Sequence, residues 1–332
     1  MSEDRPRLPV SVLMVTWLSS DVLPASLAAL AAADPPPTEL VVVDNASTDG
    51  SAELVEEFAV GAAFPVRIVR SARNIGFAAG MNRAIDASSA PFVFLHNPDL
   101  RLLPDTLSRL HERMAGSDAS VYAVGPRLRR ASGDGLAATT TLDSTGIRMT
   151  RDGRHLDRGA GEPDDGRFDR AEEVFGSSGA AVLLRREALD AGRIDGQVFD
   201  EDFFAYREDA DLAWRMRGFG YRAMYEPAAV AYHLRRVTPE RRRELSASVN
   251  RHSVKNRFLL RIHHADRGWL VRFGPRSLAR DVVVIGACLT VERSSLPALR
   301  WVLRNLPRHF ERRRQILARR VVSSAELRSW FG

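Results

Sequence analysis

The first 115 residues alternate short apolar runs with amphipathic segments, and this alternation constrains the fold more than any other feature of the chain. The apolar, β-branched runs are 10–17, 40–43, 66–69 and 92–95, and the segments with helical spacing are 21–33, 49–59, 78–88 and 104–115. Buried strands that alternate with helices predict βαβ units, and hence a Rossmann-like α/β fold whose mostly parallel sheet is flanked by helices. Ligands of such sheets bind beyond the carboxyl ends of the strands.

Polar side chains follow each of these predicted strands, so we expect them on one rim of the sheet. Trp17 and Asp44 end the first two runs, and Arg73 and the segment 97–99 follow the next two. A carboxylate at a strand end, such as Asp44, can accept hydrogen bonds from a ribose hydroxyl or a base N–H. Taken alone, the position is better explained by a turn-forming Asp.

Two further rim segments have the chemistry of a phosphate or metal site. Asn74 and Gly76 lie at a predicted helix start, where backbone N–H groups suit phosphate or ribose oxygens. Asn97-Pro98-Asp99 offers a carboxylate of the kind that Mg²⁺ and Mn²⁺ bind together with substrate phosphates. His233 ends another apolar run and would suit Mn²⁺ as a ligand, although a lone His after a strand is more often structural. Helix capping is the alternative for the first segment, and a strand-ending turn is the alternative for the second.

The stretch 203–217, which reads FFAYREDADLAWRMR, places three carboxylates at the start of a predicted helix. They are Glu208, Asp209 and Asp211, and they stand between aromatic and apolar residues. The free N–H groups of a first helical turn favour anions, so acidic capping is one explanation. A catalytic role is the other.

Composition separates the chain into an acidic and a basic part. The 332 residues carry a net charge of +6, but residues 234–332 hold 23 Lys and Arg against 7 Asp and Glu, whereas residues 1–233 hold 25 against 35. One cysteine, Cys288, excludes an internal disulfide. The polar N-terminus differs from a signal peptide, so we expect a cytoplasmic protein.

The chain after residue 130 predicts a change of architecture. Residues 131–172 are rich in Gly, Asp, Ser and Thr and predict a long loop or hairpin inserted in a domain of residues 1–235. Residues 236–332 predict a basic helical region, with helices at about 240–262, 266–291, 297–317 and 323–330.

This region suits either membrane binding or packing and oligomerisation. Arginines interleaved with Trp269, Leu270, Phe273 and Trp301 favour helices that lie on an anionic membrane. We therefore expect a peripheral protein at the inner face of the plasma membrane. The alternative is a helical subdomain that packs on the catalytic domain or forms a homo-oligomer. Without zinc spacing or a recognition helix, we expect no nucleic-acid partner.

Five motifs in this order resemble those of glycosyltransferase family 2 with the GT-A fold, particularly its bacterial rhamnosyltransferase-like and galactofuranosyltransferase-like members. They are VVVDNASTDGS, RNIGFAAGMN, LHNPDL, FGSSGAAVLLRRE and FFAYREDADLAWRMRGFGY. The resemblance covers residues 10 to about 235. It implies an inverting, metal-dependent transfer of a sugar from a nucleotide diphosphate sugar to a hydroxyl of a lipid-linked or cell-envelope glycan.

The resemblance also assigns roles to individual residues. Asp209 is the implied catalytic base, and Asp99 and His233 are the implied ligands of Mn²⁺ or Mg²⁺. Glu208 is expected to orient the acceptor, and Asp211 to hold the helix start or a neighbouring Arg. The implied donor-binding residues are Thr16, Asp44, Arg73, Asn74, Gly76, Asn97 and Asp99, and the implied acceptor-binding residues are Ser178, Gly179 and Glu208.

The variant motif Asn97-Pro98-Asp99 lacks the first carboxylate of the family's Asp-X-Asp, which favours a dTDP-sugar, with dTDP-rhamnose as the expected donor. A UDP-sugar-dependent transferase, such as a galactofuranosyltransferase, is the alternative. Leu18 and His96 depart from the family pattern, at positions where the family has an Asn and an apolar residue. A non-catalytic sugar-nucleotide-binding subunit is the alternative from another class of function.

Overall fold

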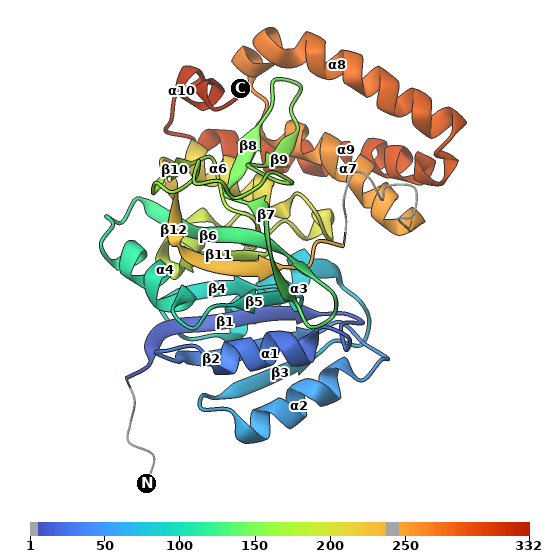
Figure 1. Ribbon diagram of the computed structural model, residues 1–332. Coiled ribbons are helices and arrows are strands. Elements are labelled where there is room, and N and C mark those ends of the chain that lie inside the picture. The colour runs from blue at the N-terminus through green and yellow to red at the C-terminus, as the bar shows by residue number, and fades with distance from the viewer. Residues whose placement is uncertain (1–5, 237–245) are drawn as a thin grey trace.

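The computed structural model describes residues 6–236 and 246–332, and its central element is a ten-stranded mixed sheet (Figure 1). Eight strands follow the order β10-β12-β6-β11-β4-β1-β2-β3, while β5 pairs with β12 and β7 with β6. The strands of this sheet are β1 (Leu8–Thr16), β2 (Pro37–Asp44), β3 (Val66–Arg70), β4 (Phe92–His96), β5 (Leu100–Leu102), β6 (Val121–Ser132), β7 (Ala137–Ser144), β10 (Glu172–Val174), β11 (Ala181–Arg185) and β12 (Arg222–His233).

The part β3-β2-β1-β4 is parallel throughout, which confirms the predicted βαβ units. Because β2 and β4 lie on opposite sides of β1, the strand order reverses there, and a crevice at the carboxyl ends suits a ligand. The helices of this half are α1 (Leu23–Ala31), α2 (Ser51–Gly61), α3 (Gly76–Ala87) and α4 (Thr106–Ala115).

Alternating side chains of β1 divide the core between the two faces of the sheet. Val12 and its neighbours on one face pack against α1 and α4. Leu13 and Val15 on the other face join a cluster with α3, α5 (Arg186–Gly192) and α6 (Glu208–Gly218). The helix that begins with Glu208 is therefore held against the sheet by its own apolar residues.

The residues predicted as a loop or hairpin form two hairpins. β6 and β7 pair antiparallel, and β8 (Ile147–Met149) pairs with β9 (His155–Asp157). The backbone N–H of Gly332 donates to the Met149 carbonyl oxygen, 3.1 Å away, so the chain end packs against the second hairpin.

The C-terminal helices share a hydrophobic core with the part of the chain that forms the sheet. They are α7 (Ala247–His264), α8 (Arg267–Thr290), α9 (Leu296–Ala318) and α10 (Ser324–Ser329), and the start of the helix expected at 240–262 lies partly outside the described residues. Phe175 and Trp214 pack in one cluster with Leu259, Trp269 and Phe273.

The expectation that Trp269 and Phe273 meet lipid is wrong, because both side chains are 5% exposed or less inside this cluster. Leu270, which was expected to meet lipid together with them, is 51% exposed. Within the described ranges, no single helix is both long and apolar enough to cross a bilayer. α8 and residues 293–318 are long and apolar enough only when they are taken together, and the chain bends by 109° between them.

Gly176 allows α6 to approach the sheet, and we predict that Gly176→Ala destabilises the fold. An added Cβ would lie 2.3 Å from the Cβ of Ala213 in α6, so the helix must shift. Such overpacking costs about 1–3 kcal/mol, measurable by urea unfolding. Gly61→Ala is the control, because nothing lies within 4 Å of its added Cβ. Equal unfolding midpoints for wild type and Gly176→Ala would contradict the prediction.

Candidate active site

Asp44 is oriented at the end of β2 by two hydrogen bonds. The hydroxyl of Thr16, the last residue of β1, donates to Oδ1 over 3.1 Å, and the Ser47 N–H donates to Oδ2 over the same distance. Both Thr16 and Asp44 are buried. The parallel pairing of β1 with β2 therefore brings together two residues that are 28 positions apart in the sequence.

The start of α3 forms a second side of this rim. Asn74 Oδ1 accepts from the Gly76 N–H over 2.8 Å, and Asn45 Nδ2 donates to the Gly76 carbonyl over 3.1 Å. Gly76 has φ +86°, and a Cβ there would lie 2.6 Å from Phe204. Glycine is thus required both by the backbone and by the close approach of Phe204. Arg73 is exposed just before this turn.

Asp99 and His233 meet at the junction of β5 and β12. His233 Nε2 lies 3.3 Å from Asp99 Oδ1, and the N–H of Leu234 donates to the Asp99 carbonyl over 3.0 Å. Asn97, two residues earlier, donates its N–H to the Ala180 carbonyl. The antiparallel register of β5 and β12 therefore brings these two distant residues together.

His233 is held from its other side by Asp143, a residue that we did not predict from the sequence. His233 Nδ1 lies 2.8 Å from Asp143 Oδ2, and Arg235 Nε lies 2.6 Å from Asp143 Oδ1. Burial lowers the pKa of His233, but Asp99 and then Asp143 outweigh it and raise the pKa to about 10. One signal was available, since Asp143 follows the strand-like run TTTL.

The side chains of Asp99 and His233 fit a divalent cation. Asp99 Oδ1 is buried and lies 3.3 Å from His233 Nε2, so a cation would take the place of the proton that the two side chains share. Carboxylate oxygen and imidazole nitrogen are a donor set that suits Mn²⁺. The contact of Asp143 with the remaining ring nitrogen resembles the carboxylate–His arrangement that orients metal-bound histidines.

Asp209 lies in the first turn of α6, where its carboxylate accepts two backbone hydrogen bonds. Gly179 N–H donates to Oδ2 over 3.1 Å, and Ala210 N–H donates to Oδ1 over 2.7 Å. A Cβ on Gly179 would lie 3.4 Å from the Asp209 Cβ, in ordinary van der Waals contact, so the two residues pack closely. Ser178 precedes this contact, and its Oγ is 3.4 Å from the Ala180 nitrogen.

Glu208, next to Asp209, has a different environment. Its side chain is buried, and within the described residues its Oε2 has no hydrogen-bond partner. Burial, and then the charge of Asp209, raise the pKa of Glu208 to about 8. At neutral pH this carboxyl is therefore mostly protonated and can donate a hydrogen bond.

Two residues that sequence reasoning missed connect these groups. Burial, and then Glu208 and Asp99, raise the pKa of Tyr206, which places its phenol within the field of both carboxylates. Burial, and then Arg207, lower the pKa of His155 on β9, against the effect of Asp209. The start of α6 thus faces the Asp99 side and the second hairpin.

The structure shows more partners for Asp211 than the expected helix start or Arg. Its Oδ2 lies 3.9 Å from Arg215 Nη2, but its Oδ1 lies closer to the rings of His263 and His264, at 3.0 and 2.8 Å. His96, which departs from the family pattern, is fully buried, and burial lowers its pKa to about 4, so it packs as a neutral residue.

Comparison with known proteins identifies the class. The mixed sheet with its flanking helices matches the GT-A fold, and residues 11–192 match the model of the family "Glycosyl transferase family 2". The chain belongs to glycosyltransferase family 2 and is a nucleotide-sugar glycosyltransferase.

Similar proteins extend this assignment. An N-acetylglucosaminyl-diphospho-decaprenol L-rhamnosyltransferase of Mycobacterium tuberculosis is 29% identical over 243 residues, which span 67% of this chain and 75% of that protein. A mannosyltransferase from Pyrobaculum calidifontis, solved with GDP-Man and Mn²⁺, has a TM-score of 0.54 at 18% identity and is covered over 86% of its chain, against 95% of this one. Residues 1–349 of S. aureus TarS, solved with UDP-GlcNAc, have a TM-score of 0.54 at 15% identity, with 94% and 91% covered. These structures share the fold.

The environment of Glu208 predicts a pH-dependent stability. Because its folded-state pKa of about 8 lies above the unfolded value of 4.5, the stability it contributes is complete below pH 4.5 and is lost as the pH rises through 8. Glu208→Gln mimics the protonated carboxyl, so this variant does not lose that stability as the pH rises. We therefore expect its melting temperature to exceed that of wild type increasingly between pH 4.5 and 8, by calorimetry.

Glu57→Gln makes the same change on the exposed surface of α2 and controls for the loss of a surface charge. A constant difference between Glu208→Gln and wild type across this pH range would count against the buried, protonated carboxyl.

Proposed function

We propose that the chain is an inverting, metal-dependent transferase that moves L-rhamnose from dTDP-rhamnose to a hydroxyl of a lipid-linked glycan. The similarity to a mycobacterial rhamnosyltransferase named for a decaprenol-linked substrate supports the sugar and the class of acceptor. The motif Asn97-Pro98-Asp99 supports the same donor. The observation that carries the reaction is the paired carboxyls Glu208 and Asp209 at the start of α6, in different environments.

Asp209 is the proposed catalytic base. The acceptor hydroxyl must lose its proton as it attacks the anomeric carbon, and the attack opposite the leaving diphosphate inverts the configuration. Each Asp209 oxygen accepts one backbone hydrogen bond and retains a lone pair for the acceptor hydroxyl. Glu208, mostly protonated at neutral pH, cannot serve as a base there, but it can donate to the acceptor and orient it.

The rim residues divide between donor and cation. Asp44, oriented by Thr16, accepts from the base or ribose of the nucleotide in this proposal, and Asp99 and His233 would hold Mn²⁺ or Mg²⁺. The ion, when bound, neutralises charge on the departing diphosphate. The remaining donor contacts are assigned to Arg73, Asn74, Gly76 and Asn97, and the remaining acceptor contacts to Ser178 and Gly179.

Asp209→Asn tests the proposed base. The amide keeps the size of the side chain but cannot take a proton, so we expect transfer to an N-acetylglucosaminyl-diphospho-lipid to fall about 10²-fold or more. Affinity for dTDP with Mn²⁺, measured by calorimetry, should stay at the wild-type value. Asp99→Ala should give the opposite pattern, with dTDP binding weakened only when Mn²⁺ is present.

Near-normal turnover in Asp209→Asn would eliminate it as the base. Equal dTDP affinity with and without Mn²⁺ in both proteins would eliminate the proposed cation site. If wild type transferred sugar from UDP-sugars but not from dTDP-rhamnose, the donor assignment alone would be wrong.

The outer face of α8 supports a lipid surface as the location of the acceptor. Leu278 and Val282 are 64% and 63% exposed, one turn apart, and continue a stripe along the helix. The exposed apolar residues of α8 are Leu270, Val271, Leu278, Val282, Val283 and Leu289. Arg272 and Arg276 are exposed beside the stripe, four residues apart, while Arg280 lies 3.4 Å from Asp152 Oδ2. Apolar residues flanked by arginines suit an anionic bilayer, where the arginines meet lipid phosphates.

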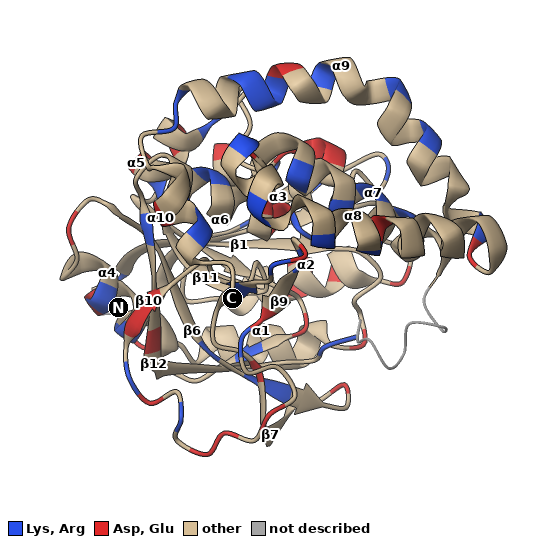
Figure 2. Ribbon diagram, turned by 90° about the horizontal axis from the view of Figure 1, so that it is seen from above, with Lys and Arg blue, Asp and Glu red and all other residues tan. Residues whose placement is uncertain are grey.

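The acidic residue of α8 is compatible with binding of the outer face to an anionic bilayer. Asp281 lies 3.0 Å from Arg257 Nε and 2.6 Å from Arg261 Nη2, so α7 neutralises it on the inner face. Figure 2, which looks down on the C-terminal helices, shows that basic residues, all of them Arg, also recur along α9. We therefore propose peripheral binding at the inner face of the plasma membrane.

We predict that wild type floats with phosphatidylglycerol vesicles, in a salt-sensitive manner, and that Leu278→Asp with Val282→Asp does not. Acidic residues in the stripe would both repel anionic lipid and resist insertion. Transfer to a soluble acceptor analogue should be unchanged in this variant. Flotation through a density gradient measures the first effect.

Val60→Asp is the matched control, because Val60 is 91% exposed on α2, away from α8. Wild type that stays unbound with these vesicles would overturn the membrane proposal. A double variant that also elutes as a smaller species would instead identify the stripe as an interface between two copies of this chain.

A further inference from the structure

The loop that leads into α6 has a backbone that its residues do not favour. Phe204, Tyr206 and Arg207 have φ of 64°, 70° and 74°, so three non-glycine residues are left-handed within four positions. Each such residue costs about 1–2 kcal/mol relative to a right-handed backbone. Glu208 and Asp209 follow immediately, so the position of both carboxyls depends on whatever holds this loop.

Asn256 of α7 supplies that support. Its side-chain nitrogen donates to the carbonyl oxygens of Phe203, Ala205 and Tyr206, at 2.9, 2.8 and 2.6 Å. Asn256 is fully buried, and a buried carbonyl without a partner is costly. The two hydrogens of one amide group therefore serve three carbonyls of the same strained loop.

The same helix also contacts α6 just beyond Asp209. His263 lies seven residues after Asn256, two helical turns, and therefore on the same face of α7. Its Nδ1 is 3.0 Å from Asp211 Oδ1, and His264 Nε2 is 2.8 Å from the same oxygen. The backbone before Asp209 and the side chain two residues after it are thus both attached to α7.

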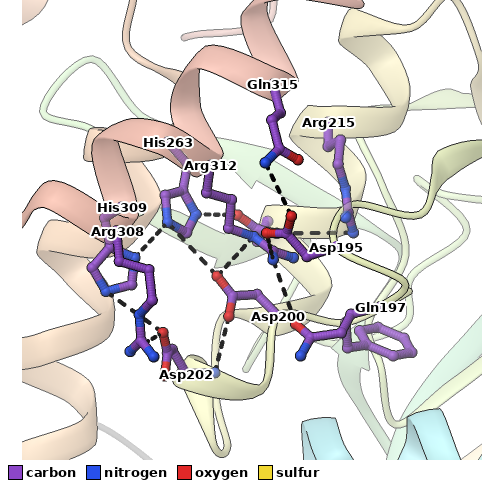
Figure 3. Close-up of polar contacts among 12 residues, drawn as sticks. Asp195, Gln197, Asp200, Asp202, Arg215, His263, Arg308, His309, Arg312 and Gln315 are labelled. Atoms are coloured by element: carbon purple, nitrogen blue, oxygen red, sulfur yellow. Dashed lines mark hydrogen bonds and ion pairs between the residues drawn. The ribbon is translucent and has the colours of Figure 1, made fainter. Parts of the chain in front are cut away.

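Helix α9 fixes the segment that precedes the loop. Figure 3 shows Arg312 directed at Asp200 and Arg308 at Asp202. Asp200 caps the 3-10 helix η1 (Glu201–Phe203), and Asp202 lies within it. Arg312 Nε is 3.0 Å from Asp200 Oδ2, and Arg308 Nη2 is 2.5 Å from Asp202 Oδ2. These arginines balance the charge of the acidic segment from the C-terminal side.

On its other side the loop touches the donor rim. The Ala78 N–H of α3 donates to the Phe204 carbonyl over 3.0 Å, and the Phe204 ring occupies the space that a side chain at Gly76 would fill. The loop is therefore clamped between α3, which carries the proposed donor contacts, and α7.

We infer that Asn256 is a positioning residue of the transfer reaction, which holds the loop so that Asp209 and Glu208 face the donor. The C-terminal helices then complete the active site in addition to any membrane contact. This inference rests on the proposed role of Asp209. It assigns to α7 the geometry of the acceptor half of the site, whereas the contacts of Asp44 and Asn74 do not involve α7.

Asn256→Asp tests the inference with almost no change in volume. A carboxylate cannot donate to the three carbonyls and would repel them, so the loop should leave its position. A misplacement of about 1 Å can cost about 10²-fold, and we expect kcat to fall by that order while dTDP affinity changes less than about threefold. Asn305→Asp is the matched control, because Asn305 Nδ2 donates to the Trp301 carbonyl within α9, over 2.7 Å.

Hydrogen exchange provides a second readout that needs no activity. Peptides covering residues 203–212 should exchange faster in Asn256→Asp than in wild type or Asn305→Asp, while peptides of α8 should not. If Asn256→Asp does not fold, Asn256→Ser, which keeps one donor, takes its place with the same expectations. Unchanged exchange at 203–212, or loss of kcat equal to that of Asn305→Asp, would overturn the inference.

These readouts separate this inference from the proposed function. A wild-type protein without transferase activity, together with faster exchange at 203–212 in Asn256→Asp, would refute the reaction but retain the clamp. A dTDP affinity that falls as far as kcat would show that Asn256 supports the whole fold and does not position the acceptor half.

Discussion

Three carboxyls within the first turn of one buried helix cannot all be charged and unpartnered, and the structure around α6 follows from this constraint. Glu208 is buried beside Asp209, and its raised pKa keeps it mostly protonated at neutral pH. Asp211 is fully buried against two histidines and Arg215. Asp209, the proposed base, accepts two backbone hydrogen bonds and is partly exposed. Three acids of one helical turn thus have three different environments.

At the proposed cation site, too, neighbouring residues decide how a side chain is oriented. His233 could point either ring nitrogen at Asp99, but Asp143, which is itself paired with Arg235, contacts one of them. The remaining nitrogen faces Asp99 Oδ1, 3.3 Å away. The orientation of one proposed ligand is therefore decided by a residue on a hairpin that carries no recognisable motif.

The C-terminal helices have two faces with different chemistry. The inner face carries Asn256, His263 and Trp269 into contact with the loop and helix that bear the proposed base. The outer face of α8 carries exposed apolar residues beside arginines. A helical region that both supports the acceptor half of the site and lies on lipid would bring the site to the membrane where a lipid-linked acceptor is held.

The sequence by itself determined the parallel half of the sheet, because period, strand length and β-branched composition are local properties that predict βαβ units in 10–115. It also determined which residues follow the strand ends, and the five ordered motifs determined the family. Tertiary structure alone decided the contact of Asp143 with His233, the burial of Trp269 and the clamp by Asn256. The contacts of Asp143 and Asn256 join residues 50 to 90 positions apart, and local patterns carry no information about which distant side chain fills a given space.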